Sequence, residues 1–171
     1  YRLLEAKRVV AVVGAAFGDQ LVVRALFDYA ALLHDVAAVG DLQRDEISFS
    51  FRGNNFVGQL VAPPASQGPK PLVIVIHNYQ GLKFFDVDVA EYLARLGYVG
   101  LAIDLYGDTV PADERDFPED PQKIPAFQKK CFEGMVAMDH DHELFRSLLA
   151  EWIRLGLEHT SVESAFAPAA I

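Results

Sequence analysis

Residues 71–77 read PLVIVIH and residues 98–104 read YVGLAID, and these two apolar runs decide the fold of the chain. Neither run alternates apolar with polar residues, which is typical of a strand covered by helices on both faces. The stretch between them predicts a helix that begins at Asp86 and ends near Gly97. A strand, a helix of this length and a second strand form a right-handed unit with parallel strands. We therefore expect an α/β fold with a mainly parallel sheet.

The flanking sequence adds further elements on both sides of this unit. Residues 46–51 and 55–62 flank Arg52-Gly53-Asn54, which predicts a β-hairpin because Gly and Asn tolerate positive φ. A polar, proline-rich loop at 105–123 follows the second run. Two flanking helices are predicted after it, at 124–138 and 141–158.

The first forty residues differ in character from the rest, and we treat 1–40 as a strand-helix segment of uncertain origin. Residues 8–13 predict a buried strand, and residues 19–37 carry apolar side chains at helical spacing. Between them lies the glycine-flanked stretch Gly14-Ala15-Ala16-Phe17-Gly18.

Composition and charge narrow the possible functions. The 171 residues suffice for one domain with a sizeable core. Fifteen Lys and Arg against 24 Asp and Glu give a net charge of −9, which disfavours nucleic acid and anionic membrane as partners. The single cysteine, Cys131, forms no internal disulfide and suits a reducing cytoplasm. No run is long and apolar enough for a membrane span, and no metal or other cofactor is expected.

Two loops are the natural place for a ligand, because ligands bind beyond the carboxyl ends of parallel strands. The first loop is His77–Leu82 and the second is Asp104–Asp108, and each combines polar side chains with a glycine. Many strand-to-helix loops share this composition without binding anything. Asp104 is more often a strand-end anchor than a catalyst, and no nucleophile is placed near His77 by a motif.

Several blocks of the chain resemble one family. They are PLVIVIHNYQGL (71–82), DVDVAEYLARLGYVGLAIDLYGD (86–108), FQKKCFEGMVAMDHD (127–141) and FRSLLAEWIRLGLEHTSVE (145–163). Together they resemble the dienelactone hydrolase family of α/β-hydrolases, which cleave ester or lactone bonds of small molecules. The resemblance implies that residues 41–171 are the N-terminal portion of such a domain. It also implies a small-molecule ester or lactone as the partner.

The resemblance implies a role for the loop after residue 77. In the family this loop supplies a backbone N–H to the oxyanion hole, and the matching residue here is Tyr79. Asn78 stands where the family often carries a glutamate, and an amide cannot serve as a charged partner for a nucleophile. Gln80, Gly81 and Tyr106 are the residues expected to contact substrate.

The acidic loop argues against one substrate class. Many family members place an arginine just after the DLY segment, whereas this chain has Gly107 and Asp108 there. Residues 104–120 contain seven acidic residues and a single base, Arg115. A lactone that carries a carboxylate is therefore a poor fit.

The family's catalytic machinery is not visible in this sequence. Its nucleophile elbow, G-x-C-x-G or G-x-S-x-G, normally follows the kind of segment seen at 161–171, and its acid and histidine come later. We therefore expect an incomplete chain that ends just before the elbow. Residues 14–18 have the outline of an elbow, with Ala16 where Cys or Ser would stand. The segment 9–13 could occupy the place of the elbow strand beside 71–77, or the likeness could be coincidental.

Other reactive side chains have simpler explanations. Cys131 falls among the apolar residues of a predicted helix and reads as a core thiol. His140 and His142 point to different helix faces and indicate a polar helix start rather than a metal site. His159 and Ser161 are too close in sequence to predict a catalytic dyad.

Three hypotheses follow from the sequence. The first is a dienelactone hydrolase-like enzyme for small esters or lactones, inactive as this chain alone because nucleophile, acid and catalytic histidine are missing. The second is a non-catalytic binding or self-association module, with a homodimer formed through an open sheet edge. The third is a fragment without a function of its own.

Overall fold

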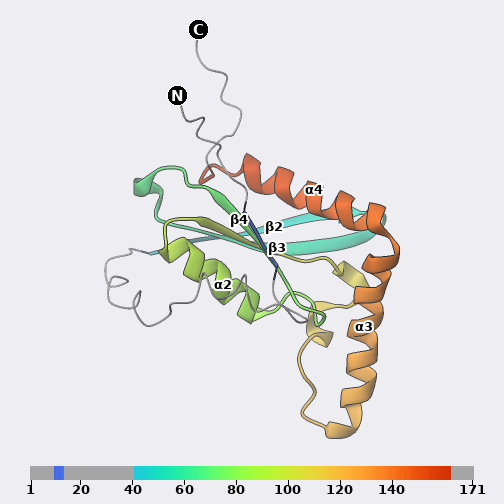
Figure 1. Cartoon of the computed structure of the whole chain (residues 1–171). Coiled ribbons are helices and arrows are strands. Elements are labelled where there is room, and N and C mark those ends of the chain that lie inside the picture. The colour runs from blue at the N-terminus through green and yellow to red at the C-terminus, as the bar shows by residue number, and fades with distance from the viewer. Residues whose placement is uncertain (1–9, 14–40, 163–171) are drawn as a thin grey trace, which may run out of the picture.

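A computed structural model describes residues 10–13 and 41–162 of the chain (Figure 1). The principal elements are the strands β1 (Val10–Val13), β2 (Gln43–Phe51), β3 (Asn54–Ala62), β4 (Leu72–Ile76) and β5 (Val99–Ile103), and the helices α2 (Phe84–Arg95), α3 (Ile124–His140) and α4 (His142–Glu158). No helix within these described ranges is long and apolar enough to cross a membrane.

The strands form one mixed sheet in the order β1-β4-β5-β3-β2. The pairs β1–β4 and β4–β5 are parallel, as the strand-helix-strand unit predicted. The pairs β5–β3 and β3–β2 are antiparallel, so the prediction of a mainly parallel sheet is wrong in this respect. The reason is that β3, the second strand of the hairpin, runs antiparallel to β5 as well as to β2, so both pairs that involve β3 are antiparallel.

The predicted hairpin is confirmed, and its turn explains the tight reversal. Only Arg52 and Gly53 separate the two strands, with φ of 49° and 80°. Positive φ at both central residues is the geometry of a type I′ turn, whose twist matches that of the flanking strands.

Helices cover both faces of the central strands, as the uniformly apolar runs predicted. Leu72 and Ile74 of β4 share one core cluster with Trp152 of α4. Val73 and Val75, which point the other way, share a second cluster with residues of α2 such as Leu93. Figure 1 shows α4 and α2 on opposite sides of the sheet.

Aspartates cap the N-terminal ends of the helices α2 and α4. Helix α2 begins at Phe84 rather than at Asp86, because the Asp86 carboxylate reaches back to accept the Lys83 N–H at 2.9 Å. The Asp141 carboxylate accepts the Leu144 N–H at 2.8 Å and starts α4 directly after α3. Helix α3 meets α4 at an angle and extends beyond the sheet (Figure 1).

Strand β1 is the part of the first forty residues that the structure describes. It pairs in parallel with β4, from Val10 opposite Val73 to Val13 opposite Ile76, which agrees with the possibility that 9–13 lies beside 71–77. The elbow-like turn at 14–18, which contains Ala16, and the predicted helix at 19–37 lie outside the described residues. The division of the chain at residue 40 stays a prediction.

Candidate active site

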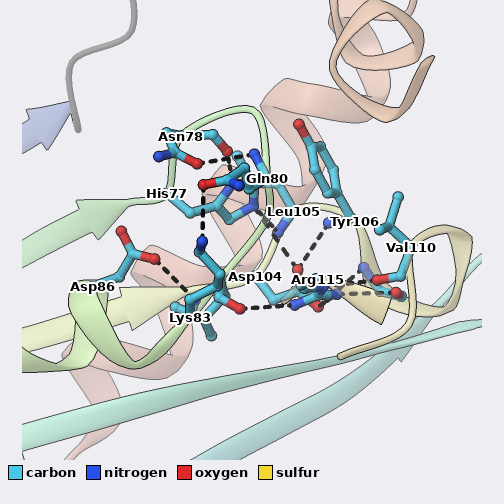
Figure 2. A network of polar contacts seen from close by, with 12 residues as sticks. His77, Asn78, Gln80, Lys83, Asp86, Asp104, Leu105, Tyr106, Val110 and Arg115 are labelled. Carbon is cyan, nitrogen blue, oxygen red and sulfur yellow. Dashed lines mark hydrogen bonds and ion pairs between the residues drawn. The ribbon is translucent and has the colours of Figure 1, made fainter. Parts of the chain in front are cut away.

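The two predicted loops lie together at the carboxyl ends of β4 and β5. In the parallel register Ile76 stands opposite Ile103, so β4 and β5 end side by side. The Leu105 N–H donates to Nε2 of His77 at 3.1 Å, and the Tyr106 hydroxyl donates to the Tyr79 carbonyl at 3.0 Å. Figure 2 shows the polar network that results.

Both ring nitrogens of His77 are occupied by backbone groups. Because Nε2 accepts a hydrogen bond from the Leu105 N–H, the proton lies on Nδ1, which donates to the Asn78 carbonyl at 2.6 Å. Burial lowers the pKa of the imidazole, and the Asp104 carboxylate at 3.9 Å only partly opposes this. His77 is therefore a neutral structural group and not a free general base.

Residues 78–81 form a tight turn. The Asn78 carbonyl accepts the Gly81 N–H at 3.1 Å, and the Asn78 side-chain oxygen accepts the Gln80 N–H at 2.9 Å. Gly81 has φ of 91°, and a Cβ there would lie 2.8 Å from Cδ of Arg115. Only glycine fits the last position of the turn without displacing its neighbour.

The Tyr79 backbone is fixed through a hydrogen bond to its carbonyl, while its backbone N–H is available to bind a ligand. Its carbonyl accepts the Tyr106 hydroxyl, whereas its N–H makes no hydrogen bond within residues 10–13 and 41–162. The turn thus presents one backbone donor whose position is set by its neighbours. Such an arrangement can bind a carbonyl oxygen or an oxyanion.

Asp104 and Arg115 form a buried ion pair behind the loops, and each side chain is 4% exposed. The Asp104 carboxylate accepts hydrogen bonds from the backbone N–H groups of Tyr106 and Gly107. It accepts a further one from Nη2 of Arg115 at 3.0 Å. Arg115 also donates to the carbonyls of Val110 and Gly107. These bonds confirm the anchor role expected for Asp104, and they leave Arg115 no free edge for a substrate carboxylate.

Tyr106 and Gln80 support the turn from two sides. Tyr106 is buried and lies edge-on to the His77 ring, with 4.6 Å between centroids. Burial also raises the pKa of its hydroxyl. The Gln80 side-chain oxygen accepts a hydrogen bond from the Lys83 ammonium at 2.8 Å. The backbone carbonyl oxygen of Gln80 lies 4.0 Å from Sγ of Cys131.

A cavity of about 570 Å³ opens beside this turn. It is lined by Tyr79 and by residues of α3, namely Pro125, Gln128, Lys129, Phe132 and Met135. The same residue that presents the free N–H therefore also contributes to the wall of the cavity. Volumes of this size are usual for small-molecule sites.

Cys131, His159 and Ser161 are engaged in contacts away from the turn or are buried. Cys131 is fully buried, as expected of a core thiol, and burial raises its pKa. Nε2 of His159 contacts the Asp45 carboxylate at 3.1 Å, and its Nδ1 accepts the Ser161 N–H at 3.2 Å. The Ser161 hydroxyl bonds to Gln43 rather than to His159, so these residues form no dyad.

The sheet order, the crossover helix and the loops at the carboxyl ends of β4 and β5 are those of an α/β-hydrolase-type domain. The match to the model of the Dienelactone hydrolase family extends over residues 57–149, more than half of the chain. The chain belongs to the dienelactone hydrolase family.

Individual relatives agree with this assignment. A protein of Escherichia coli K12 named "Putative carboxymethylenebutenolidase" is 30% identical over 95 residues, which cover 56% of this chain and 34% of that protein. The chain thus spans about a third of the length of the curated relatives it matches. The solved structure m3DLH is 25% identical with a TM-score of 0.56, over 73% of this chain and 47% of the other.

A second solved structure supports the fold alone. It is the dienelactone hydrolase-like promiscuous phosphotriesterase P91 from metagenomic libraries, 18% identical with a TM-score of 0.56. The match covers 74% of this chain and 47% of that one.

Two features of the site escaped the sequence analysis. Arg115 is a solitary base in an acidic loop, and nothing in the pattern around it predicts burial against Asp104. The cavity on α3 was also missed, because Phe132 and Met135 have the spacing of ordinary core residues. Tyr79 and the α3 residues that line the cavity are far apart in sequence, so no local pattern brings them together.

Proposed function

We propose that this chain provides the substrate-binding side of a dienelactone hydrolase-like site for small esters or lactones. The backbone N–H of Tyr79 serves as one donor of the oxyanion hole. The observation that supports this role is the free Tyr79 amide on a turn held by Tyr106 and Asn78. A fixed donor aimed at a developing oxyanion is worth about 3–4 kcal/mol of the activation barrier.

The neighbouring residues have supporting roles in this proposal. Asn78 orients the turn through its side chain, and Gly81 allows the close approach of Arg115. Tyr106 acts through the Tyr79 carbonyl and is a positioning residue. Gln80 is half-buried next to Tyr79, and we expect it to contact substrate.

We further propose that this chain does not hydrolyse esters on its own. The sequence has no G-x-C-x-G or G-x-S-x-G motif, Cys131 lies buried under the Gln80 carbonyl, and His77 has both nitrogens engaged. We expect the native chain to cleave p-nitrophenyl acetate no faster than a heat-denatured sample. Robust turnover that one side-chain substitution abolishes would contradict this.

Ligand binding tests the oxyanion role without requiring turnover. Titration of the ¹⁵N-labelled chain with γ-butyrolactone should move the Tyr79 amide proton downfield in a saturable manner. The Gly97 amide, in a remote turn, is the control and should stay in place. A Tyr79 amide that does not respond to the lactone would refute the proposed role.

A second candidate function is self-association through a sheet edge. Strand β2 pairs only with β3 in the described sheet, so its other edge can add a strand from a second copy. Arg44 and Glu46 are exposed along β2, and such charges discourage indiscriminate pairing. Light scattering decides the matter, since a dimer across this edge should be lost on replacing Ser48 by proline.

We also propose a cytoplasmic location. The support for it is the single cysteine, Cys131, which is a free buried thiol and needs no oxidising compartment. Cell fractionation of the source organism tests this, and recovery of the chain in an exported fraction would contradict it.

A further inference from the structure

The cavity beside Tyr79 has apolar walls contributed mainly by one helix. Phe132 and Met135 lie one turn apart on α3, and Pro125 lies near the start of the same helix. The Phe132 side chain is 51% exposed, which is unusual for a large apolar residue. A cavity with such walls gains most from a ligand whose apolar surface it removes from water.

The cavity and the candidate oxyanion donor meet in one residue. Tyr79 lines the cavity, and its main chain belongs to the turn that carries the N–H without a partner among the described residues. A ligand that places a carbonyl oxygen on this N–H can therefore extend its remaining part along Phe132 and Met135.

The surroundings of the cavity are acidic. The 104–120 segment packs against the helix that lines it, because Glu114 pairs with Lys130 and the Phe117 ring lies edge-on to Phe127 at 5.4 Å. Seven acidic residues lie in this segment. Asp104 pairs with Arg115, the single base of the segment, and Glu114 pairs with Lys130, which leaves five carboxylates without a basic partner among the described residues. Their combined field disfavours an anionic ligand.

Lys129, the one cation among the described residues that line the cavity, does not offset this field. The Lys129 side chain is 76% exposed, so its ammonium is in solvent. It also faces the Glu133 carboxylate at 3.8 Å, one helical turn away. An exposed and already paired ammonium contributes little to binding a carboxylate.

From these observations we infer that the cavity of Tyr79 and α3 is the specificity pocket of the site. It selects esters or lactones with an uncharged, apolar acyl or alcohol part and disfavours those that carry a carboxylate. This inference rests on the proposed function for the identity of the reacting bond, but the selection itself resides in the cavity walls.

Two matched probes that cannot be hydrolysed test the selection. The uncharged ketone 2-acetonaphthone imitates an apolar aryl ester, and 6-acetyl-2-naphthoate adds one carboxylate to the same skeleton. Dissociation constants for the full chain come from ¹H–¹⁵N chemical shifts at pH 7.5. We expect the ketone to bind about tenfold more tightly than the carboxylate at low salt, with a smaller ratio at 0.5 M NaCl. The amides of Phe132 and Met135 should shift most.

Two phenylalanine variants locate the binding. Phe132→Ala should weaken ketone binding about tenfold, because it removes an aromatic wall. Phe84→Ala is the matched control, since Phe84 is 73% exposed and does not line the cavity, and its dissociation constant should equal that of the native chain. Circular dichroism confirms that both variants are folded.

The inference is overturned if the carboxylate binds as tightly as the ketone, if neither probe gives a saturable shift, or if Phe132→Ala binds like Phe84→Ala. Its failure is distinct from that of the proposed function. Shifts at Phe132 and Met135 report the cavity, whereas the Tyr79 amide in the lactone titration reports the oxyanion role. If the probes shift the Phe132 and Met135 amides but the lactone does not shift the Tyr79 amide, the preference of the cavity for uncharged ligands stands and the oxyanion role of Tyr79 is refuted.

Discussion

The Tyr106 hydroxyl donates a hydrogen bond to the Tyr79 carbonyl across 3.0 Å and so joins the loops that follow β4 and β5. Tyr106 itself is buried, with 4% of its surface exposed. The Tyr79 main chain is therefore fixed from the protein side, while its N–H stays available. This relationship explains how a surface turn can present a donor in one orientation.

Replacing Tyr106 by phenylalanine removes this bond and leaves the ring in place. We expect the free energy of unfolding to fall by about 1–2 kcal/mol, because the Tyr79 carbonyl loses its donor. We also expect faster hydrogen exchange at the Gln80 amide, which shares a peptide unit with that carbonyl. Urea denaturation and amide exchange measure the two effects. Unchanged exchange in a destabilised Tyr106→Phe variant would show that the hydroxyl does not position the turn.

Replacing Asp104 by asparagine leaves the buried Arg115 without a counter-charge. Breaking a buried pair in this way costs about 3–5 kcal/mol, so we expect a large drop in the urea midpoint. The matched control is Glu91→Gln, which breaks the ion pair with Arg44 at the surface. That change should lower the midpoint far less. Equal losses in the two variants would show that the Asp104–Arg115 pair is not desolvated.

Replacing Gly81 by alanine tests the close approach of Arg115. Gly97 is the control, because its φ of 88° is nearly the same as that of Gly81 but nothing lies within 4 Å of its missing Cβ. Both variants bear the strain of positive φ, while Gly81→Ala also displaces Arg115. We expect about 1–3 kcal/mol of additional destabilisation for Gly81→Ala, measured by urea denaturation. Equal destabilisation of both variants would exclude a steric role for Arg115.

The neutral state of His77 makes stability depend on pH. Burial lowers its folded pKa, so below the unfolded value of about 6.5 only the unfolded chain binds the proton. The free energy of unfolding should therefore decrease as pH falls from 7.5 to 5.5, with a limiting slope of about 1.4 kcal/mol per unit. Comparison with His77→Gln isolates this contribution from the other histidines. Parallel pH profiles for the two proteins would contradict the assigned neutral state.

Some of the fold was predictable from local sequence alone. The uniformly apolar residues at 71–77 and 98–104 predicted doubly covered strands, and Arg52-Gly53-Asn54 predicted the hairpin. The mixed sheet was not predictable in the same way, because the pairing of β3 with β5 joins residues about forty positions apart. The sequence placed the start of α2 two residues too late. It took Asp86 as the residue that precedes the helix, whereas Asp86 is the third helical residue and caps by accepting the Lys83 N–H.

The site was predictable to a smaller extent. The loop positions follow from the parallel register of β4 and β5, which brings His77 and Asp104 to one edge. The hydrogen bonds and protonation state of each side chain do not follow from this register, because they depend on partners that are distant in sequence. Nothing near His77 indicates that Leu105 occupies its second nitrogen.

Trp152 donates its indole N–H to the Asp104 carbonyl at 2.7 Å and is the single tryptophan of the chain. All intrinsic indole fluorescence of this protein therefore originates at one fully buried ring beneath the Asp104 loop. Admission of water to that ring shifts its emission to longer wavelength, so the integrity of the site can be followed optically without any label.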